Sequence, residues 1–228
     1  MSNRPAGTLR LAWKLLVRDW RAGELTVLAA ALLVAVASMT GVAFLTDRVG
    51  QAVEMRAAES LAADLRLDST RPISENYTDL AAANGLHDAR VTRMPSVVFA
   101  GETNTLSAVG AVTSGYPLRG RLKTSERLLG EVQVTDAIPA PGEAWAAPRL
   151  LARLGVDTGA EIEVGAARLR VTRVLDFRPD EGWSFVDLAP TLLINMKDLD
   201  STALVQPGSR VSYRQLFAGQ RNDIESFK

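Results

Sequence analysis

Residues 25–45 read LTVLAAALLVAVASMTGVAFL, a run from Leu25 to Leu45 that contains no proline and no ionisable side chain. A helix of this length rises about 31 Å, which matches the hydrocarbon thickness of a lipid bilayer. The sequence therefore predicts a transmembrane helix over residues 25–45.

Two other structures share this composition. A helix buried in a soluble core would normally carry a polar face, whereas this run offers only Thr26, Ser38 and Thr40. The apolar part of a signal peptide is the second alternative, because residues 35–37 (Ala-Val-Ala) resemble a small-residue cleavage site. However, the apolar run continues well beyond Ala37, and the leader before it is long for a signal peptide. We therefore favour an uncleaved transmembrane helix.

The charges of the chain are distributed in blocks around this run. The 228 residues include 26 basic and 26 acidic side chains, so the formal charge is zero. Residues 1–24 carry five basic and two acidic side chains, and residues 46–228 carry all the others. The positive-inside rule then predicts a cytoplasmic N-terminus in a bacterial inner (plasma) membrane, with residues 46–228 in the periplasm. The neutral balance also argues against a nucleic-acid partner.

The leader before the span has the pattern of an amphipathic helix. Its apolar side chains recur at helical spacing on one face: Leu9, Trp13, Leu16 and Trp20. Its basic side chains lie on a second face: Arg10, Lys14, Arg18 and Arg21. This pattern predicts a cytoplasmic helix within residues 1–24 that is anchored in membrane lipid by its tryptophans, Leu16 and its cations. The alternative is a basic segment that only sets the topology.

Small residues recur four positions apart in the span, at Ala31 and Ala35 and at Ala37 and Gly41, with Ser38 beside them. This spacing lets helix backbones approach closely in lipid. Alanine is common in any membrane helix, so the pattern alone is a weak signal. We expect this face to contact other transmembrane helices.

The residues after the span predict a helical stalk and then an α+β domain. Residues 46–62 continue the helical pattern, and residues 63–228 mix short helices with strands that pair as hairpins. Strands are expected at 63–67, 89–100 with an interruption at Pro95, 103–112, 160–164, 167–177 and 183–194. Helices are expected at 74–83, 145–154 and 198–204. A turn is expected at 101–104, and a turn-rich loop at 115–124.

The sequence offers little for catalysis or metal binding. It contains no cysteine, one histidine and no G-x-x-x-x-G-K-[ST], G-x-S-x-G or S-x-x-K motif. His87 follows Asn84-Gly85 and is expected to be a solvated turn residue. Four carboxylates could perform acid–base chemistry or bind calcium, although a polar hairpin loop is the favoured interpretation: Asp176, Asp180, Glu181 and Asp187. We expect no enzymatic activity, no cofactor and no metal.

Four segments, in this order, carry a likeness to a known family. They are LRLAWKLLVRDWRAGELTVLAAALLVAVASMTGVAFLTDRV (9–49), ESLAADLRLDSTRPI (59–73), GYPLRGRL (115–122) and APRLLARLGVDTGAEIEVGAARLRVTRVLDFRPDEG (147–182). No single segment is diagnostic, but their order and spacing resemble the FtsX/MacB-like permeases of ABC transporters. Among these, the chain resembles the large YbbP-type permeases.

The resemblance implies a MacB-like periplasmic α+β domain and a role in transport. A cytoplasmic ABC ATPase subunit would bind the permease, and the stalk would pass the movement driven by ATP hydrolysis to the periplasmic domain. The result would be export or extraction of a hydrophobic or lipid-like substrate. Family members have several spans, so this chain would be the N-terminal part of a permease and would pack against its other transmembrane helices. The alternative is a single-pass membrane-anchored periplasmic binding or scaffold protein.

Overall fold

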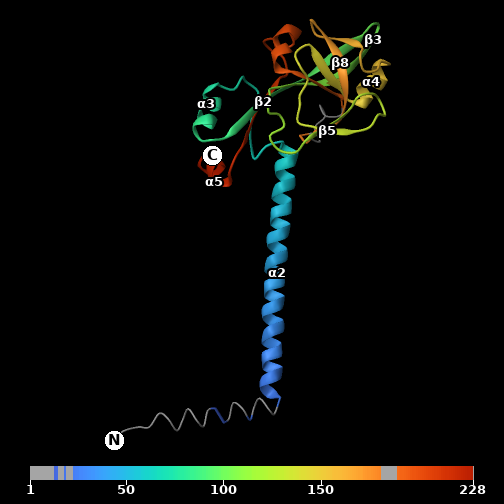
Figure 1. Cartoon of the computed structure of the whole chain (residues 1–228). Coiled ribbons are helices and arrows are strands. Elements are labelled where there is room, and N and C mark those ends of the chain that lie inside the picture. Colours follow the sequence, from blue (N-terminus) through green and yellow to red (C-terminus); the bar gives the residue numbers. More distant parts are fainter. Residues whose placement is uncertain (1–12, 15–17, 19–22, 181–188, 228) are drawn as a thin grey trace. The chain divides into compact units, whose positions relative to one another are not determined.

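The computed structural model describes residues 13–14, 18, 23–180 and 189–227 (Figure 1). Contacts divide the chain after Glu54 into two compact units. The first unit holds most of one long helix, and the second is a domain of short helices and strands. This confirms the predicted fold class, an N-terminal apolar helix followed by an α+β domain.

Helix α2 (Glu24–Leu61) runs without interruption for 38 residues. Gly23, at φ 83°, precedes it, and Ala62, at φ 58°, follows it. Alanine, leucine and valine dominate its first half and it contains no proline, so nothing in its sequence breaks the ladder of backbone hydrogen bonds. The segments expected as span and stalk therefore lie in one continuous helix.

The apolar part of α2, Leu25–Val53, is long enough and apolar enough to cross a membrane. Its side chains are exposed from Thr26 onwards, which is not the pattern of a helix buried in a soluble core.

The leader before Gly23 is described at three positions only. Trp13, Lys14 and Arg18 are helical and exposed. The other predicted anchors lie outside the described residues: Leu16, Trp20, Arg10 and Arg21. The interfacial helix therefore stays a prediction.

The described strands of the domain form one ten-stranded sheet in the order β1-β10-β2-β3-β9-β6-β8-β4-β5. Their bounds are β1 (Leu65–Ser69), β2 (His87–Ala100), β3 (Thr103–Val112), β4 (Leu122–Ser125), β5 (Gln133–Thr135), β6 (Glu143–Ala146), β7 (Glu161–Val164), β8 (Ala167–Phe177), β9 (Thr191–Asn195) and β10 (Ser212–Ala218). Strand β7 pairs with both β2 and β8, so β2, β3, β9, β6, β8 and β7 close into a ring. Closure leaves those strands without an open edge.

The main hydrophobic core is formed by alternate residues of the six strands of this ring. Val98 of β2, Val109 of β3 and Ile194 of β9 are among its fully buried members. Helix α4 (Pro148–Leu154) adds Leu150 and Leu151 to the same core. A smaller core around Phe217 of β10 is completed by the helices α3 (Asn76–Ala83) and α5 (Arg221–Phe227).

Strand β2 continues through Pro95, so the expected interruption is wrong. Pro95 lies opposite Ala108 of β3. The N–H of Ala108 donates to the carbonyl of Pro190 at 3.0 Å, on the other side of β3. The pair therefore needs no hydrogen bond from position 95, and the missing N–H of proline does not weaken the sheet.

The helix expected at 145–154 was predicted to start too early. Glu143–Ala146 form strand β6, and α4 begins only at Pro148. A residue before proline avoids helical backbone angles, and Ala147 is extended, with φ −60° and ψ 147°. Pro148 then occupies the first turn of the helix, where no N–H donor is needed.

Other elements agree with the sequence to different degrees. Strands β3 and β8 have the predicted bounds, and β2 and β3 are joined by the predicted turn. The helix expected at 198–204 is replaced by two 3₁₀ turns, Met196–Asp198 and Asp200–Thr202. Strand β4 begins inside the predicted loop 115–124, and β5, β10 and α5 were not predicted. Of the strand predicted at 183–194, residues 183–188 lie outside the described residues.

Candidate functional site

Asp64 follows helix α2 in the sequence and is held in the domain by hydrogen bonds. Its N–H donates to the carbonyl of Phe217 at 3.0 Å. Its carboxylate accepts two hydrogen bonds from Arg119, from Nε to Oδ1 at 2.8 Å and from Nη2 to Oδ2 at 2.5 Å. The N–H of Gly219 donates to the same Oδ2 at 3.1 Å. We call residues 62–64 together with Arg119 and Gly219 the Asp64 junction.

The backbone of the Asp64 junction is also held in one conformation. The N–H of Arg119 donates to the carbonyl of Ala62 at 3.0 Å, and Ala62 and Ala63 are fully buried. Ala62 has a φ of 58°, which costs a residue with a Cβ roughly 1–2 kcal/mol. A bidentate arginine–carboxylate pair has a fixed geometry. The junction therefore holds a strained, buried turn in one conformation where α2 ends.

A buried ion cluster follows strand β8. The side chains of Arg178 and Asp180 are 1% and 2% exposed. The Tyr116 hydroxyl donates a hydrogen bond to Oδ1 of Asp180. Nη1 of Arg178 lies 3.7 Å from the same oxygen, and Nη1 of Arg214 lies 3.6 Å from Oδ2. The cluster joins the end of β8 to β10 and to the loop that carries Tyr116.

The protonation states within the cluster follow from its charges. Burial pushes the pKa of Asp180 upward, but the charges of Arg178, Arg93 and Arg214 and the hydrogen bond from Tyr116 together outweigh this effect, and the pKa is lowered. Burial, reinforced by the charge of Asp180, raises the pKa of Tyr116 well above its ordinary value. Asp180 is therefore ionised and Tyr116 protonated at neutral pH, which suits structural pairing rather than proton transfer.

The acidic residues singled out in the sequence do not assemble into a site among the described residues. Asp176 is exposed on β8, Asp180 is buried in the ion cluster, and Glu181 and Asp187 lie outside the described residues. Across the described part of the chain, no group of three or more His, Cys, Asp or Glu side chains could hold a metal. Asp180 is buried rather than exposed in a polar hairpin loop as predicted, because pairing with arginine permits its burial. His87 is exposed at the start of β2, as predicted.

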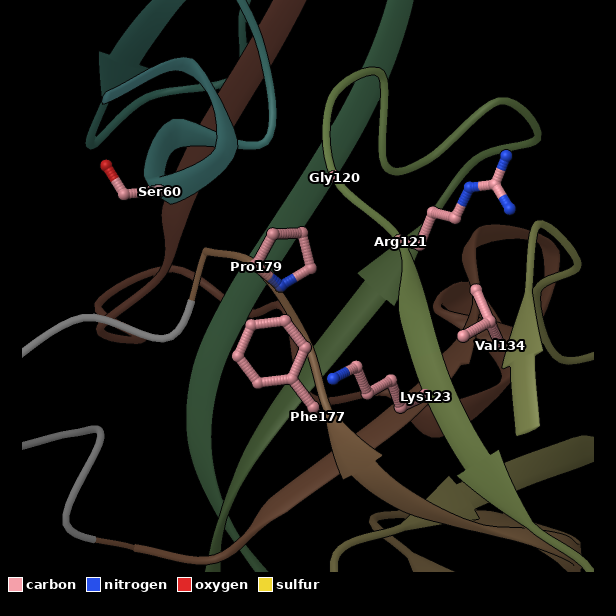
Figure 2. Close-up of a pocket in the computed structure, with 7 residues that line it drawn as sticks. All are labelled: Ser60, Gly120, Arg121, Lys123, Val134, Phe177 and Pro179. Atoms are coloured by element: carbon pink, nitrogen blue, oxygen red, sulfur yellow. The ribbon is translucent and has the colours of Figure 1, made fainter. Parts of the chain in front are cut away.

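A pocket of about 730 Å³ lies next to the ion cluster (Figure 2). Its lining residues come from the end of α2, the loop before β4, and strands β4, β5 and β8 with the turn that follows: Ser60, Gly120, Arg121, Lys123, Val134, Phe177 and Pro179. Its volume is in the range of small-molecule sites.

The pairing of β4 with β5 and β8 brings three of the pocket residues side by side. Lys123 of β4 lies opposite Val134 of β5 on one side and opposite Phe177 of β8 on the other. Figure 2 shows the Lys123 ammonium directed towards Phe177 and Pro179, whereas the Arg121 guanidinium extends away from them. The Lys123 Nζ is 5.5 Å from the centroid of the Phe177 ring. The arrangement can hold an anion against an apolar wall.

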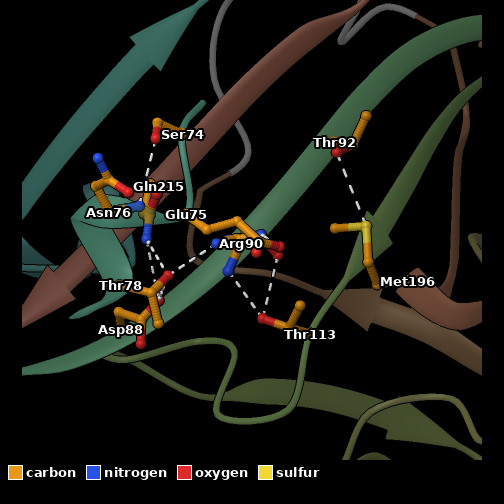
Figure 3. Close-up of polar contacts among 10 residues, drawn as sticks. All are labelled: Ser74, Glu75, Asn76, Thr78, Asp88, Arg90, Thr92, Thr113, Met196 and Gln215. Carbon is orange, nitrogen blue, oxygen red and sulfur yellow. Dashed lines mark hydrogen bonds and ion pairs between the residues drawn. The ribbon is translucent and has the colours of Figure 1, made fainter. Parts of the chain in front are cut away.

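A polar network ties α3 to β2 and β10 (Figure 3). The Thr78 Oγ1 accepts from Arg90 Nη2 at 2.9 Å and from Gln215 Nε2 at 2.9 Å, and it lies 3.2 Å from Asp88 Oδ2. Gln215 is fully buried and also donates to Asp88 Oδ2 at 3.1 Å. Both bonds are made by the amide nitrogen of Gln215, and they hold α3 against the sheet.

The predicted contact residues of the span all lie in α2: Leu25, Ala31, Ala35, Ala37, Ser38, Gly41 and Leu45. A Cβ added at Gly41 would meet no atom within 4 Å. The helix therefore leaves room for another helix there, and that contact stays a prediction.

Sequence reasoning missed both the Asp64 junction and the pocket. Nothing in the local sequence indicates that Arg119 pairs with Asp64, or that Phe177 lies beside Lys123. Those pairings come from strand register and loop path.

No family model matches this chain. Among curated proteins, the chain is 34% identical over 211 residues to an uncharacterized ABC transporter permease, YbbP, of Escherichia coli (strain K12). The match covers 92% of this chain and 25% of YbbP, so the chain spans about a quarter of that relative's length.

Two solved structures are similar in part. The extracellular domain of the noncanonic ABC-type transporter YknZ from Gram-positive bacteria is 13% identical, with a TM-score of 0.48 over 68% of this chain and 76% of that one. The periplasmic region of MacB from Actinobacillus actinomycetemcomitans is also 13% identical, with a TM-score of 0.44 over 68% of this chain and 71% of that one.

The sequence match extends over nearly the whole chain, from the apolar helix into the mixed domain. It includes a helix able to cross a membrane, as a permease requires. The resemblance to ABC transporter permeases that the four segments carry is thereby confirmed by the match to YbbP.

Proposed function

We propose that this chain is the N-terminal part of an ABC transporter permease that couples ATP hydrolysis to movement of a periplasmic domain. Residues 1–24 lie on the cytoplasmic side, residues 25–45 cross the inner membrane, residues 46–62 form the stalk, and residues 63–228 lie in the periplasm. A cytoplasmic ABC ATPase subunit supplies the hydrolysis. The outcome is export or extraction of a hydrophobic or lipid-like substrate.

The Asp64 junction carries this proposal. A helix can move a domain only if its end neither slides nor turns independently of that domain. The two hydrogen bonds from Arg119 to Asp64, the bond from Gly219 and the buried turn at Ala62 all oppose such slippage. A helix that served only as a tether would gain nothing from this arrangement.

The coupling can be tested with Arg119→Gln, which removes the bidentate pair. The full permease is purified from host membranes together with its ATPase, and a bimane fluorophore is attached at Glu102→Cys, an exposed position in the β2–β3 turn. We expect ATP to change bimane fluorescence in the wild type. Arg119→Gln should lose most of that change while still hydrolysing ATP.

The matched control is Arg168→Gln, which removes an exposed ion pair with Glu163 on the same domain. It should leave the ATP-dependent signal unchanged. An unchanged signal in Arg119→Gln would overturn coupling through the junction. Failure of any ATP-hydrolysing subunit to copurify would overturn the proposed function and favour a membrane-anchored scaffold.

The orientation is tested separately. Residues 1–228 contain no cysteine, so a single cysteine introduced among them is the only one in this part of the permease. A membrane-impermeant maleimide added to spheroplasts should label Glu102→Cys, and it should label Asn3→Cys only after permeabilisation. The reverse pattern would place the domain in the cytoplasm and contradict the positive-inside prediction.

A further inference from the structure

Lys123 lies in a row between two apolar side chains that folding leaves exposed. Val134 is 53% exposed and Phe177 is 43% exposed, and register places them on either side of Lys123. Both line the 730 Å³ pocket. Apolar surface left open in a concave site is surface that a ligand can cover.

The two cationic side chains that line the pocket, Lys123 and Arg121, can bind an anionic ligand. No carboxylate of the described residues pairs with Lys123, whose ammonium lies over the Phe177 ring. Arg121 has one weak partner, with its Nε 3.8 Å from Asp136 Oδ1 and side chains 67% and 81% exposed. Such an exposed pair is worth little, so an incoming anion can replace Asp136.

The wall opposite Lys123 is preorganised. Pro179 lines the pocket and is buried between Arg178 and Asp180, the central pair of the ion cluster. The cluster fixes the backbone on both sides of Pro179, so the apolar wall does not have to be ordered when a ligand binds. This lowers the entropic cost of binding.

We infer that this pocket binds an anionic amphiphile, a molecule with a carboxylate or phosphate head and an aliphatic chain. The head accepts hydrogen bonds from the Lys123 ammonium, and the chain covers Phe177, Val134 and Pro179. The statement that such a ligand is the cargo of the permease rests on the proposed function. Binding itself needs neither the ATPase nor the other spans, so the binding inference and the proposed function can fail independently.

The test is photoaffinity labelling of the chain in phosphatidylcholine nanodiscs with a diazirine-bearing decanoate. Mass spectrometry should find label in the peptides that contain Val134 or Phe177. Excess decanoate or decyl phosphate should compete, and the comparison of these two competitors identifies the preferred head. Decanol and inorganic phosphate should not compete, because each lacks one half of the recognised chemistry.

Three variants, all at exposed positions, separate the contributions of charge and apolar surface. Lys123→Gln should lower labelling at the pocket by about tenfold, because it removes a charge-assisted hydrogen bond. Val134→Ser should weaken competition by decanoate through loss of apolar contact. Arg149→Gln removes an exposed charge outside the pocket and should change nothing.

Three results would overturn the inference. Equal competition by decanol would show that binding does not require the anionic head. Equal competition by inorganic phosphate would show that binding does not require the aliphatic chain of the ligand. Unchanged labelling in Lys123→Gln would remove the residue on which the site depends. Each would leave ATP-driven coupling standing, whereas pocket labelling without a copurifying ATPase would overturn only the proposed function.

Discussion

The hydroxyl of Tyr116 donates a hydrogen bond to the carboxylate of Asp180, and both side chains are buried. Arg178 and Arg214 approach the same carboxylate from other sides. Because burial alone would favour a neutral Asp180, this hydrogen bond and the arginines are what keep the carboxylate charged. The pair therefore joins a loop near the Asp64 junction to the wall of the pocket.

Tyr116→Phe should destabilise the domain by about 1–3 kcal/mol, because it leaves a buried carboxylate short of one donor. The measurement is the free energy of unfolding of the chain in neutral detergent, followed by tryptophan fluorescence in urea. Tyr213→Phe is the matched control, since the Tyr213 hydroxyl makes no hydrogen bond with other described residues. Equal effects of the two variants would contradict the structural role of the Tyr116 hydroxyl.

Asp180→Asn should destabilise the domain more, by about 3–5 kcal/mol at neutral pH, because it removes the buried negative charge that Arg178 and Arg214 both face. The folded pKa of Asp180 is lowered. Its contribution to stability is therefore full above the unfolded pKa, about 3.9, and is lost as the pH falls towards the folded value. The difference between Asp180→Asn and the wild type should narrow below about pH 4. A constant difference down to pH 2 would contradict the lowered pKa.

The loss of stability at high pH tests the raised pKa of Tyr116. This test does not depend on whether Asp180→Asn folds. Because the folded pKa of Tyr116 is raised, the wild type should lose stability as the pH rises above about 10, where the unfolded tyrosine ionises. Tyr116→Phe should lack this part of the loss. Identical alkaline profiles for the two proteins would contradict the raised pKa.

The sequence correctly predicted those elements whose position depends only on their own residues. Helix α2 is apolar without proline, and β3 and β8 have clear strand patterns, so their positions follow from the residues themselves. Pro95 misled the prediction because its tolerance depends on Ala108 bonding to Pro190 in a different part of the chain. The start of α4 was predicted too early because the effect of Pro148 on Ala147 was overlooked.

The functional sites were less predictable for the same reason. Asp180 was assigned to a polar hairpin loop because two of its partners, Tyr116 and Arg214, lie far from it in the sequence. The Asp64 junction joins residues 55 positions apart in the chain. Charge, spacing and periodicity report on neighbours along the chain, whereas these sites are made by register and loop path.

Thr78→Val should loosen α3 from the sheet. The substitution keeps the side-chain volume but removes an oxygen that contacts Arg90, Gln215 and Asp88. The expected loss is about 1–2 kcal/mol, because Gln215 keeps its bond to Asp88. Hydrogen exchange should accelerate at the amides of residues 76–83. Thr103→Val, at an exposed strand end, should not change exchange there, and equal protection in both variants would argue against the network.

Gly41→Leu tests whether the small-residue face of α2 packs against another helix. A Cβ at Gly41 would contact nothing within 4 Å, so the larger side chain does not disturb the described chain itself. Small residues matter in lipid because they let a second backbone approach, and a leucine there holds it away. Gly41→Leu should therefore insert normally but reduce, several-fold, the fraction of full permease that migrates as an intact assembly in native gels. Val42→Leu, which points to another side of α2, is the matched control and should assemble like the wild type. Normal assembly of Gly41→Leu would mean that this face meets lipid alone, and the span would then serve as an anchor without a helix partner at this position.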